Sequence, residues 1–313
     1  MWTLRDRYDY VHNFNSGFAF NRVSILIAKI LGKKVVTETS LIGDDDPVSL
    51  GRFKDWKDYF KPKFFRYLFY KMADRYVSKS EVITEIFKQS EIPMRKVAEI
   101  PYSVDISQFT PLDTDNKKSL RKKSGIWEEG IIILFVGGIN ARKGVQLLVD
   151  AFIKIQKKYT DLRLLVVGPT YKYDQNYINE IKNKISLNDI NDKVLLIEKN
   201  VTNVEDFMQC SDIFVLPSRQ EGFPISIIEA MSSGLAVIGS DIPEIARAQI
   251  INGKDGYVFP VGDVDALIST IEKLITDKEN FKRIKCEARK KAVDNWSTVI
   301  VDNKYKELYN SIR

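Results

Sequence analysis

The sequence predicts an α/β protein built on parallel, doubly wound sheets. Short runs rich in Val, Ile and Leu alternate with helical patterns along the 313-residue chain, which is typical of strand–helix–strand units. Several of these runs end in glycines or in a polar loop, where sheets of this kind bind ligands. The length predicts about two domains.

The alternation is most regular in the second part of the chain. The predicted strands there are Ile131–Val136, Leu162–Val167, Val194–Ile197, Ile213–Leu216, Leu235–Gly239 and Tyr257–Pro260. The predicted helices are Val145–Lys157, Tyr173–Ile185, Val204–Gln209, one that opens at Glu221, Pro243–Gln249 and Val264–Thr276. Together these elements make a complete doubly wound domain, with a ligand expected at the carboxyl ends of its strands.

The front of the chain carries fewer elements. The predicted strands are Tyr10–Phe14, Lys34–Thr39, Tyr76–Ser78 and Val97–Ile100, and the predicted helices are Phe20–Leu31, the part of Trp56–Lys71 after Pro62, and Glu81–Lys88. The polar segment Thr114–Lys123 is interpreted as a linker. We therefore expect a partial first domain over residues 1–110 and a second domain, which carries the ligand site, over 111–313. The last helix is expected to pack back on the first domain.

Composition excludes several classes of protein. Cys210 and Cys286 lie far apart and indicate free thiols in a reducing, cytoplasmic compartment. His12 is the one histidine, which argues against a histidine zinc site or a Ser-His-Asp triad. No apolar run approaches the roughly 20 residues of a membrane span, and no secretory signal is visible. The net charge of +6 suits an anionic ligand or an anionic membrane surface, and no nucleic-acid motif is present.

The most informative segment is LPSRQEGFPISIIEAMSSG, residues 216–234. Pro224 suits the first turn of a helix, and Gly222 lets the backbone approach a ligand closely. Free amides and the helix dipole at that point favour a phosphate. Glu229 would lie two helical turns after Glu221 on nearly the same side, an arrangement that suits a phosphorylated, polyhydroxylated ligand such as a nucleotide-sugar. Two carboxylates that merely benefit from the helix dipole are the alternative.

A second segment, FVGGINARKG at 135–144, combines a strand end, glycines, a basic pair and a helix start. Such a combination forms an anion cradle, although it is neither a Walker A sequence nor GxGxxG. Gly137, Gly138, Arg142 and Lys143 are the residues concerned. A solvated basic pair at a turn is the alternative.

The spacing of the two glutamates, with EGFP and EAM around them, resembles the motif of retaining GT-B glycosyltransferases of family 4, also called group 1. The resemblance implies that Glu221 and the amides after it hold the donor sugar, while Glu229 binds the ribose. Lys143 matches the family lysine on the donor diphosphate. Gly138 stands where the family has arginine, and we infer that Arg142 substitutes for it.

The resemblance implies a full set of site residues. The donor-binding residues are Gly137, Gly138, Arg142, Lys143, Gly168, Val201, Glu221, Gly222, Phe223, Pro224, Ile225 and Glu229. Glu221, Lys143 and His12 are the catalytic candidates. No metal and no cofactor are expected, since members of this family bind the diphosphate without a metal.

The implied fold is GT-B, with two Rossmann-like domains facing a cleft, and the implied reaction moves a sugar from a nucleotide-sugar to an acceptor hydroxyl with retention. The acceptor is expected to be a saccharide or a lipid-linked one, in polysaccharide or glycolipid assembly. The segments LGKKVVTETS and PYSVD also match the family, but the match begins partway into the first domain. We therefore expect an incomplete N-terminal domain with an exposed sheet edge, low solubility or a partner chain.

Two other functions stay open at this point. The chain is either an enzyme or a non-catalytic nucleotide-sugar-binding remnant that needs a partner chain, and a phosphorylase or an epimerase would share the same fold. His12 either contacts the donor phosphate or the acceptor, or is a histidine of the core.

Two segments suggest other ligands. Asp44, Asp45 and Asp46 suggest a metal, but we favour an acidic surface loop. In Trp56–Lys71 the residues Phe64, Tyr67 and Leu68 share a face, for which we favour core packing over weak peripheral membrane contact.

Overall fold

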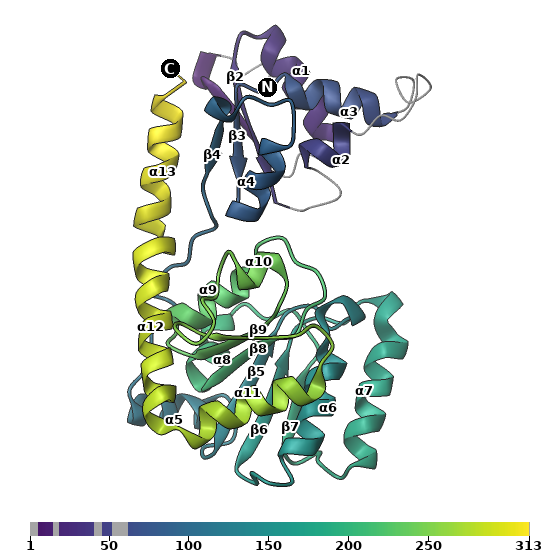
Figure 1. Ribbon diagram of the computed structural model, residues 1–313, viewed down its shortest axis with the longest axis vertical. Helices are drawn as coiled ribbons and strands as arrows, with labels where there is room; N and C mark the ends of the chain where they lie inside the picture. The colour runs from purple at the N-terminus through teal and green to yellow at the C-terminus, as the bar shows by residue number, and fades with distance from the viewer. Residues whose placement is uncertain (1–5, 15–18, 41–45, 52–61, 313) are drawn as a thin grey trace. The chain divides into compact units, whose positions relative to one another are not determined.

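The structure is a computed structural model that describes residues 6–14, 19–40, 46–51 and 62–312. The chain forms two compact units, Met1–Tyr102 with Val299–Arg313, and Ser103–Thr298. We call them unit 1 and unit 2. Each has its own parallel sheet with helices packed on it (Figure 1).

Unit 1 is built on a four-stranded parallel sheet in the order β1-β2-β3-β4. The strands are β1 (Tyr10–Asn13), β2 (Lys34–Thr39), β3 (Arg75–Ser78) and β4 (Val97–Glu99). The helices are α1 (Ala19–Ile30), α2 (Pro47–Gly51), α3 (Pro62–Lys71), α4 (Glu81–Lys88) and the last helix of the chain, α13 (Thr298–Asn310). A short 3₁₀ helix, Met94–Lys96, precedes β4.

Alternation along β2 gives this sheet two apolar faces, because successive side chains of a strand point to opposite sides. Val35 packs with Tyr70 of α3 and Phe87 of α4 on one face. Val36 packs with Val301 and residues of α13 near the C-terminus on the other. The last helix of the chain therefore completes the core of unit 1.

A buried charge cluster lies under α13. Glu38 and Lys79 form an ion pair of 2.8 Å, with their side chains 2% exposed. The Tyr305 hydroxyl donates to Glu38 at 2.9 Å and accepts from Lys79 at 2.7 Å. Burial alone would raise the pKa of Glu38, but hydrogen bonds from His12, Lys79 and Tyr305 together with the Lys79 charge hold that pKa below its usual value.

Unit 2 is built on a six-stranded parallel sheet in the order β10-β9-β8-β5-β6-β7. The strands are β5 (Ile131–Val136), β6 (Leu162–Val167), β7 (Val194–Ile197), β8 (Ile213–Leu216), β9 (Ala236–Ser240) and β10 (Tyr257–Phe259). Strands β6 and β7 are added in turn on one side of β5. The chain then crosses to the other side of β5, where it adds β8, β9 and β10. The strand order therefore reverses between β5 and β8, which makes this a doubly wound sheet.

Helices cover both faces of this sheet (Figure 1). They are α5 (Thr114–Lys123), α6 (Val145–Ile155), α7 (Gln175–Leu187), α8 (Val204–Cys210), α9 (Ile225–Ser232), α10 (Pro243–Ala246), α11 (Val264–Thr276) and α12 (Lys278–Trp296). Short 3₁₀ turns at Ala141–Lys143 and Lys172–Asp174 precede α6 and α7. Helix α11 packs on α6, and α12 packs on α9. No helix among the residues described in the two units is long and apolar enough to cross a bilayer.

The predicted α/β class with parallel sheets is confirmed, and most elements lie where the sequence placed them. The strands Lys34–Thr39, Ile131–Val136, Leu162–Val167, Val194–Ile197 and Ile213–Leu216 and the helices Glu81–Lys88 and Val264–Thr276 have the predicted bounds. Elsewhere the ends differ by a few residues, as at β9 and α10, which end at Ser240 and Ala246.

The predicted linker Thr114–Lys123 is wrong, since this segment is helix α5. The Asp113 side chain caps its first turn. Lys117 and Arg121, one turn apart, both pair with Asp212, at 2.6 and 2.8 Å. The polar composition that suggested a linker therefore belongs to a helix that is fixed to unit 2 by charge rather than by apolar contacts.

Replacing Lys79 with Met tests the charge cluster under α13. The change leaves the Glu38 carboxylate buried without its cation, and removal of one partner from a buried pair costs about 3–5 kcal/mol. We expect the free energy of unfolding of unit 1 in urea to fall by that amount. As a matched control, Lys71→Met removes a cation from the exposed Lys71–Glu91 pair and should cost under about 1 kcal/mol. Equal losses in the two variants would contradict the structure.

Candidate functional site

The candidate site of unit 2 lies where the strand order reverses. The loop after β5 carries Lys143 and the loop after β8 carries Glu221, and these two strands are hydrogen-bonded neighbours. In parallel sheets the carboxyl ends of such neighbours flank a crevice, since their connections leave in opposite directions. The topology thus brings the two predicted segments together although residues 137–212 separate β5 from β8 in the sequence.

Two glycines let the loops of this edge touch. Gly168, after β6, has φ +148°, and a Cβ there would lie 2.0 Å from the carbonyl oxygen of Gly137. Gly144 has φ +72°, and a Cβ there would lie 2.1 Å from the Pro217 carbonyl oxygen. Any side chain at either position would push the loops after β5, β6 and β8 apart.

The loop after β5 fixes the direction of Lys143. The Asn140 side chain accepts a hydrogen bond from the Lys143 amide at 3.1 Å, and Ala141–Lys143 forms one 3₁₀ turn before α6. The Tyr177 hydroxyl accepts from the amide of Gln146 in the first turn of α6, at 2.9 Å. The sequence analysis missed Asn140, although a capping residue three positions before the lysine is a visible N-terminal pattern.

The loop after β8 is held at both ends. The Arg219 amide donates to the Arg142 carbonyl at 2.8 Å, which joins it to the loop after β5. Buried Gln249 donates to the Pro224 carbonyl at 3.1 Å. The Phe223 ring meets the Trp296 ring edge-on, with centroids 6.2 Å apart. These contacts fix the segment that carries Glu221, and Gln249 was also missed because nothing in its sequence context marks it.

At the centre of the site a carboxylate lies between two cations. Lys143 Nζ is 2.7 Å from Glu221 Oε1, and Arg142 Nη1 is 3.5 Å from Glu221 Oε2. Arg142 also donates to the Gln220 carbonyl at 2.6 Å. The Arg142 side chain is 47% exposed, whereas Lys143 is 15% and Glu221 is 7% exposed. Glu221 thus contacts both cations, and the half-exposed Arg142 is open to an anionic ligand.

Helix α9 begins beside this pair without a side-chain cap. Its N-cap residue is Pro224, and no side chain accepts from its first amides. An uncapped helix start presents free N–H groups and the positive end of the dipole. With Lys143 and Arg142, it completes a site suited to phosphate.

The helical spacing predicted between Glu221 and Glu229 is wrong, because α9 starts at Ile225 and Glu221 lies in the loop before it. A residue before proline is disfavoured in the helical region, so Phe223 cannot continue the helix backwards. Pro224 itself is extended, with φ −67° and ψ 107°. Glu221 is placed by the loop contacts and Glu229 by α9.

Glu229 carries a mostly buried carboxyl group for which the described part of the chain supplies no partner. Burial, and to a lesser extent the negative charge of Glu205 in α8, raise the pKa of Glu229 to about 7. Within the described residues its carboxyl group makes no hydrogen bond or ion pair. A buried polar group without partners costs free energy, and a ligand hydroxyl that donates to it would recover that cost.

The remaining predicted donor residues lie along the same edge. Gly168 follows β6, and Val201 lies between β7 and α8. Gly222, Phe223 and Pro224 are buried, while Ile225 at the start of α9 is 40% exposed. Gly138, where the resemblance expects arginine, lies near Tyr171, since a Cβ there would be 3.5 Å from that ring.

His12 belongs to unit 1. Its Nδ1 is 2.7 Å from the Tyr309 hydroxyl, and its Nε2 is 3.5 Å from Glu38. The ring also stacks on Phe14 with centroids 4.4 Å apart. The structure therefore places His12 in the charge cluster under α13.

Of the acidic run before Pro47, the structure describes Asp46 alone. Asp44 and Asp45 lie outside the described residues. Asp46 is 1% exposed and accepts from the Ser49 amide at 2.7 Å, so for this residue the expected exposed loop is wrong and the carboxylate caps α2. In the described ranges no group of three or more His, Cys, Asp and Glu side chains is arranged to hold a metal ion.

The aromatic residues of the segment Trp56–Lys71 are only partly buried as predicted. Tyr67 and Tyr70 of α3 are in the core, and Thr39 is 2.8 Å from the Tyr70 hydroxyl. Leu68 is 47% exposed, so its predicted place on the packed face is wrong. The side chain of Phe64 and the residues 52–61 lie outside the described part of the chain.

Comparison with known proteins decides the family. The family described as "Glycosyl transferases group 1" matches residues 116–291, more than half of the chain, and includes both site loops. The chain belongs to this family. CapM of Staphylococcus aureus, a capsular polysaccharide biosynthesis glycosyltransferase, is 30% identical over 209 residues, which cover 65% of this chain and 52% of CapM.

Other relatives and solved structures agree on the fold. An Escherichia coli α-1,3-galactosyltransferase that acts on a GlcNAc-diphosphoundecaprenol is 28% identical over 71% of this chain and 56% of its own length. The chain thus spans about half the length of the curated relatives it matches. The structure of HepE from Anabaena with UDP has a TM-score of 0.84 at 17% identity and covers 99% of this chain and 80% of HepE. The fold is of the GT-B glycosyltransferase type.

Gly168→Ala tests the contact between the loops. Its Cβ would overlap the Gly137 carbonyl oxygen and hold an L-residue at a positive φ, so we expect a loss of about 3 kcal/mol in the free energy of unfolding. Gly253→Ala is the control, because Gly253 also has a positive φ, +77°, but no atom within 4 Å of the added Cβ. That variant should lose only about 1 kcal/mol. Urea unfolding measures both, and similar losses would refute the close approach.

Glu229→Gln tests the buried carboxyl group. With a folded pKa near 7 against an ordinary value of 4.5, the native state keeps its proton while the unfolded state loses it, so stability falls as pH rises from 4.5 to 7 and stays low above. Glutamine removes this penalty. We expect the variant to gain about 2–3 kcal/mol at pH 8 and little at pH 4.5, measured by urea unfolding. The same gain at both pH values would show that the carboxyl group is not the cause.

Proposed function

We propose that this protein transfers a sugar from a nucleoside-diphosphate donor to an acceptor hydroxyl, with retention of the anomeric configuration. The observation that carries the proposal is the Lys143–Glu221 pair at the point where strand order reverses, beside the uncapped start of α9. A nucleotide-sugar carries a diphosphate, which can pair with the lysine, and sugar hydroxyls, which can donate hydrogen bonds to the carboxylate.

Departure of the diphosphate is the step that these residues assist. As the bond between the sugar carbon and the phosphate oxygen breaks, negative charge grows on the leaving group. Lys143, Arg142 and the amides at the start of α9 are placed to stabilise that charge. Glu221 then accepts from sugar hydroxyls and orients the ring, while Gly222 and Phe223 keep the backbone close to it.

Glu229 is proposed to bind the ribose. Its carboxyl group is mostly buried and has no partner within the described residues, so a ribose diol supplies the hydrogen bonds it lacks. The carboxylate accepts two hydroxyl donors, whereas the protonated acid accepts less well. Because burial raises this pKa to about 7, donor affinity is expected to rise between pH 6 and pH 8.

The acceptor proton is proposed to pass to the leaving phosphate. The acceptor oxygen bonds to the sugar carbon on the face that the diphosphate leaves, and the products are a glycoside and a nucleoside diphosphate. Among the described residues of unit 2 no histidine is present to act as a base, since His12 is in unit 1. His12 remains a proposed contact to the donor phosphate or the acceptor.

The acceptor is proposed to be a saccharide or a lipid-linked saccharide in polysaccharide or glycolipid assembly, on the cytoplasmic side of the membrane. The similarity to CapM and to the galactosyltransferase of Escherichia coli supports this class of acceptor. A free phosphate or water as acceptor would instead give phosphorolysis or hydrolysis, which product analysis separates from transfer.

A partner chain for unit 1 is a second proposal, from a different observation. Strand β1 pairs with β2 alone among the described strands, so one edge of the sheet is open. On α1, Val23, Leu26 and Ile30 are 57%, 41% and 66% exposed. An open edge beside exposed apolar side chains is typical of a surface that another polypeptide covers. Donor binding without transfer, with transfer restored by a second chain, would support this proposal.

A thermal-shift screen with nucleoside diphosphates and nucleotide-sugars tests the donor site. A ligand of the native state raises the melting temperature by mass action. Lys143→Met should weaken the donor that shifts the wild type by roughly 10- to 100-fold, since a charged hydrogen bond contributes about 1.5–3 kcal/mol. Lys154→Met on α6 is the matched control, because Lys154 pairs with exposed Asp265. An unchanged shift in Lys143→Met would end the proposal.

A further inference from the structure

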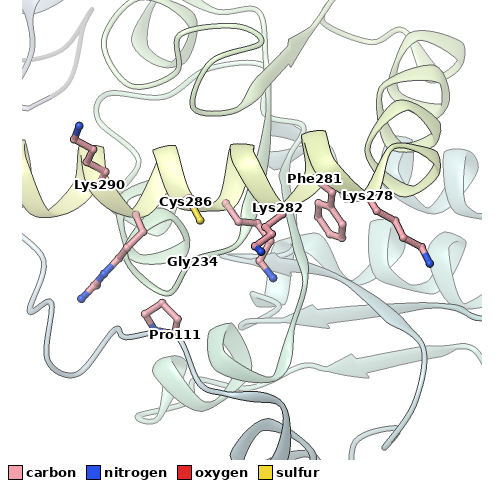
Figure 2. A pocket seen from close by; sticks show the side chains of 9 residues that line it. Pro111, Gly234, Lys278, Phe281, Lys282, Cys286 and Lys290 are labelled. Atoms are coloured by element: carbon pink, nitrogen blue, oxygen red, sulfur yellow. The ribbon is translucent and has the colours of Figure 1, made fainter.

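Helix α12 forms one wall of an open cavity that the proposed reaction does not use. The cavity has a volume of about 520 Å³ and lies within unit 2. Pro111 and Gly234 line the side opposite the helix (Figure 2). The lining residues are Pro111, Gly234, Lys278, Phe281, Lys282, Lys285, Cys286, Arg289 and Lys290.

The cavity combines an apolar floor with a cationic rim. Phe281 and Pro111 supply apolar surface, and no carboxylate is among the residues that line it. Figure 2 shows Lys282 and Cys286 on the side of α12 that faces Pro111, while Lys290 points to the other side of the helix. An anion with an attached apolar part therefore matches the lining.

One of the cations has a structural task. Arg289 donates to the carbonyl oxygens of Phe109 at 2.8 Å and Ile106 at 3.0 Å, and it also reaches Ser232. These bonds join the segment before Pro111 to α12 and α9. Arg289 thus builds the wall of the cavity and has little capacity left for a ligand.

Unlike Arg289, three lysines of the lining are available to a ligand, namely Lys278, Lys282 and Lys285. None forms an ion pair with any residue in the described part of the chain, and Lys285 lies over the Phe281 ring at 5.4 Å. By contrast, Lys291 on the same helix is 2.9 Å from Asp255. Unpaired like charges along one helix face repel one another, so an external anion stabilises them.

The arrangement favours an extended anion over a small one. From Lys278 to Lys285 the three lysines span about 11 Å along the helix at the helical rise. A site for a single small anion would aim buried donors at one point, whereas these ammonium groups are on flexible stems and follow a line. The aliphatic stem of a lysine can lie along apolar surface while its ammonium group reaches an extended charged surface.

We propose that this face of α12 docks on the surface of an anionic phospholipid bilayer, with the lysines on headgroup phosphates and the apolar floor toward the interface. This interaction goes beyond glycosyl transfer. It also differs from the membrane contact considered for residues 56–71, because it uses unit 2. The attraction of basic side chains to anionic lipid falls off within a Debye length, so docking is sensitive to salt.

Vesicle sedimentation tests the proposal with the full chain. We expect binding to vesicles of phosphatidylcholine with phosphatidylglycerol, weaker binding at high salt, and none to phosphatidylcholine alone. The triple variant Lys278→Gln, Lys282→Gln, Lys285→Gln should partition roughly tenfold less or weaker still. The control variant Lys122→Gln, Lys123→Gln, Lys157→Gln removes the same charge from exposed positions elsewhere in unit 2 and should bind as the wild type.

Cys286 offers a direct readout. It is exposed in the cavity, whereas Cys210, the other cysteine, is buried and burial raises its pKa to about 11, so a thiol probe attaches at Cys286. An environment-sensitive dye there should shift to the blue on anionic vesicles. Equal binding by the triple variant, an equal loss in the control, or release by inorganic phosphate at low salt would each overturn the proposal.

Discussion

The pairing of Lys143 with Glu221 depends on one topological constraint, the reversal of strand order between β5 and β8. Because β8 is laid down on the far side of β5, the loops that follow these two strands open toward the same crevice. The glycines Gly144 and Gly168 then allow the neighbouring loops to approach to contact distance. This arrangement brings Arg142, Lys143 and Glu221 together, while Glu229 is placed by α9.

The cations at this crevice do not act as isolated charges. Arg142 is tied to the second loop through its side chain and its carbonyl, and Lys143 is oriented by Asn140. Each loop therefore holds the other in place. Groups that are already fixed cost no reorganisation when charge develops on a bound ligand.

The strands and the two site loops could be predicted because apolar runs and glycine turns are local patterns. Lys143 and Glu221 were each predicted to contact a ligand, but not to contact one another. Their 2.7 Å contact depends on the order of strands in the sheet, which a local sequence pattern does not encode. The prediction that Glu221 and Glu229 share one helix was wrong for a local reason, because the helix starts only after Pro224. The prediction of a linker at Thr114–Lys123 was wrong because Asp212, which pairs with two cations of this helix, is distant in the sequence. The partners of His12 on α13 were unpredictable for the same reason.

Three largely buried carboxyl groups differ in whether the fold supplies a cation beside them. Glu38 has Lys79, and Asp212 has Lys117 and Arg121, so contacts outweigh burial and the pKa of each carboxyl is lowered. Glu229 has no cation beside it among the residues that the structure describes, and burial raises its pKa to about 7. A buried acid that served only stability would have acquired a partner or been replaced by an apolar residue, since an unpartnered one is a net cost. The free energy withheld from folding at Glu229 is therefore available to a ligand that brings hydroxyl donors.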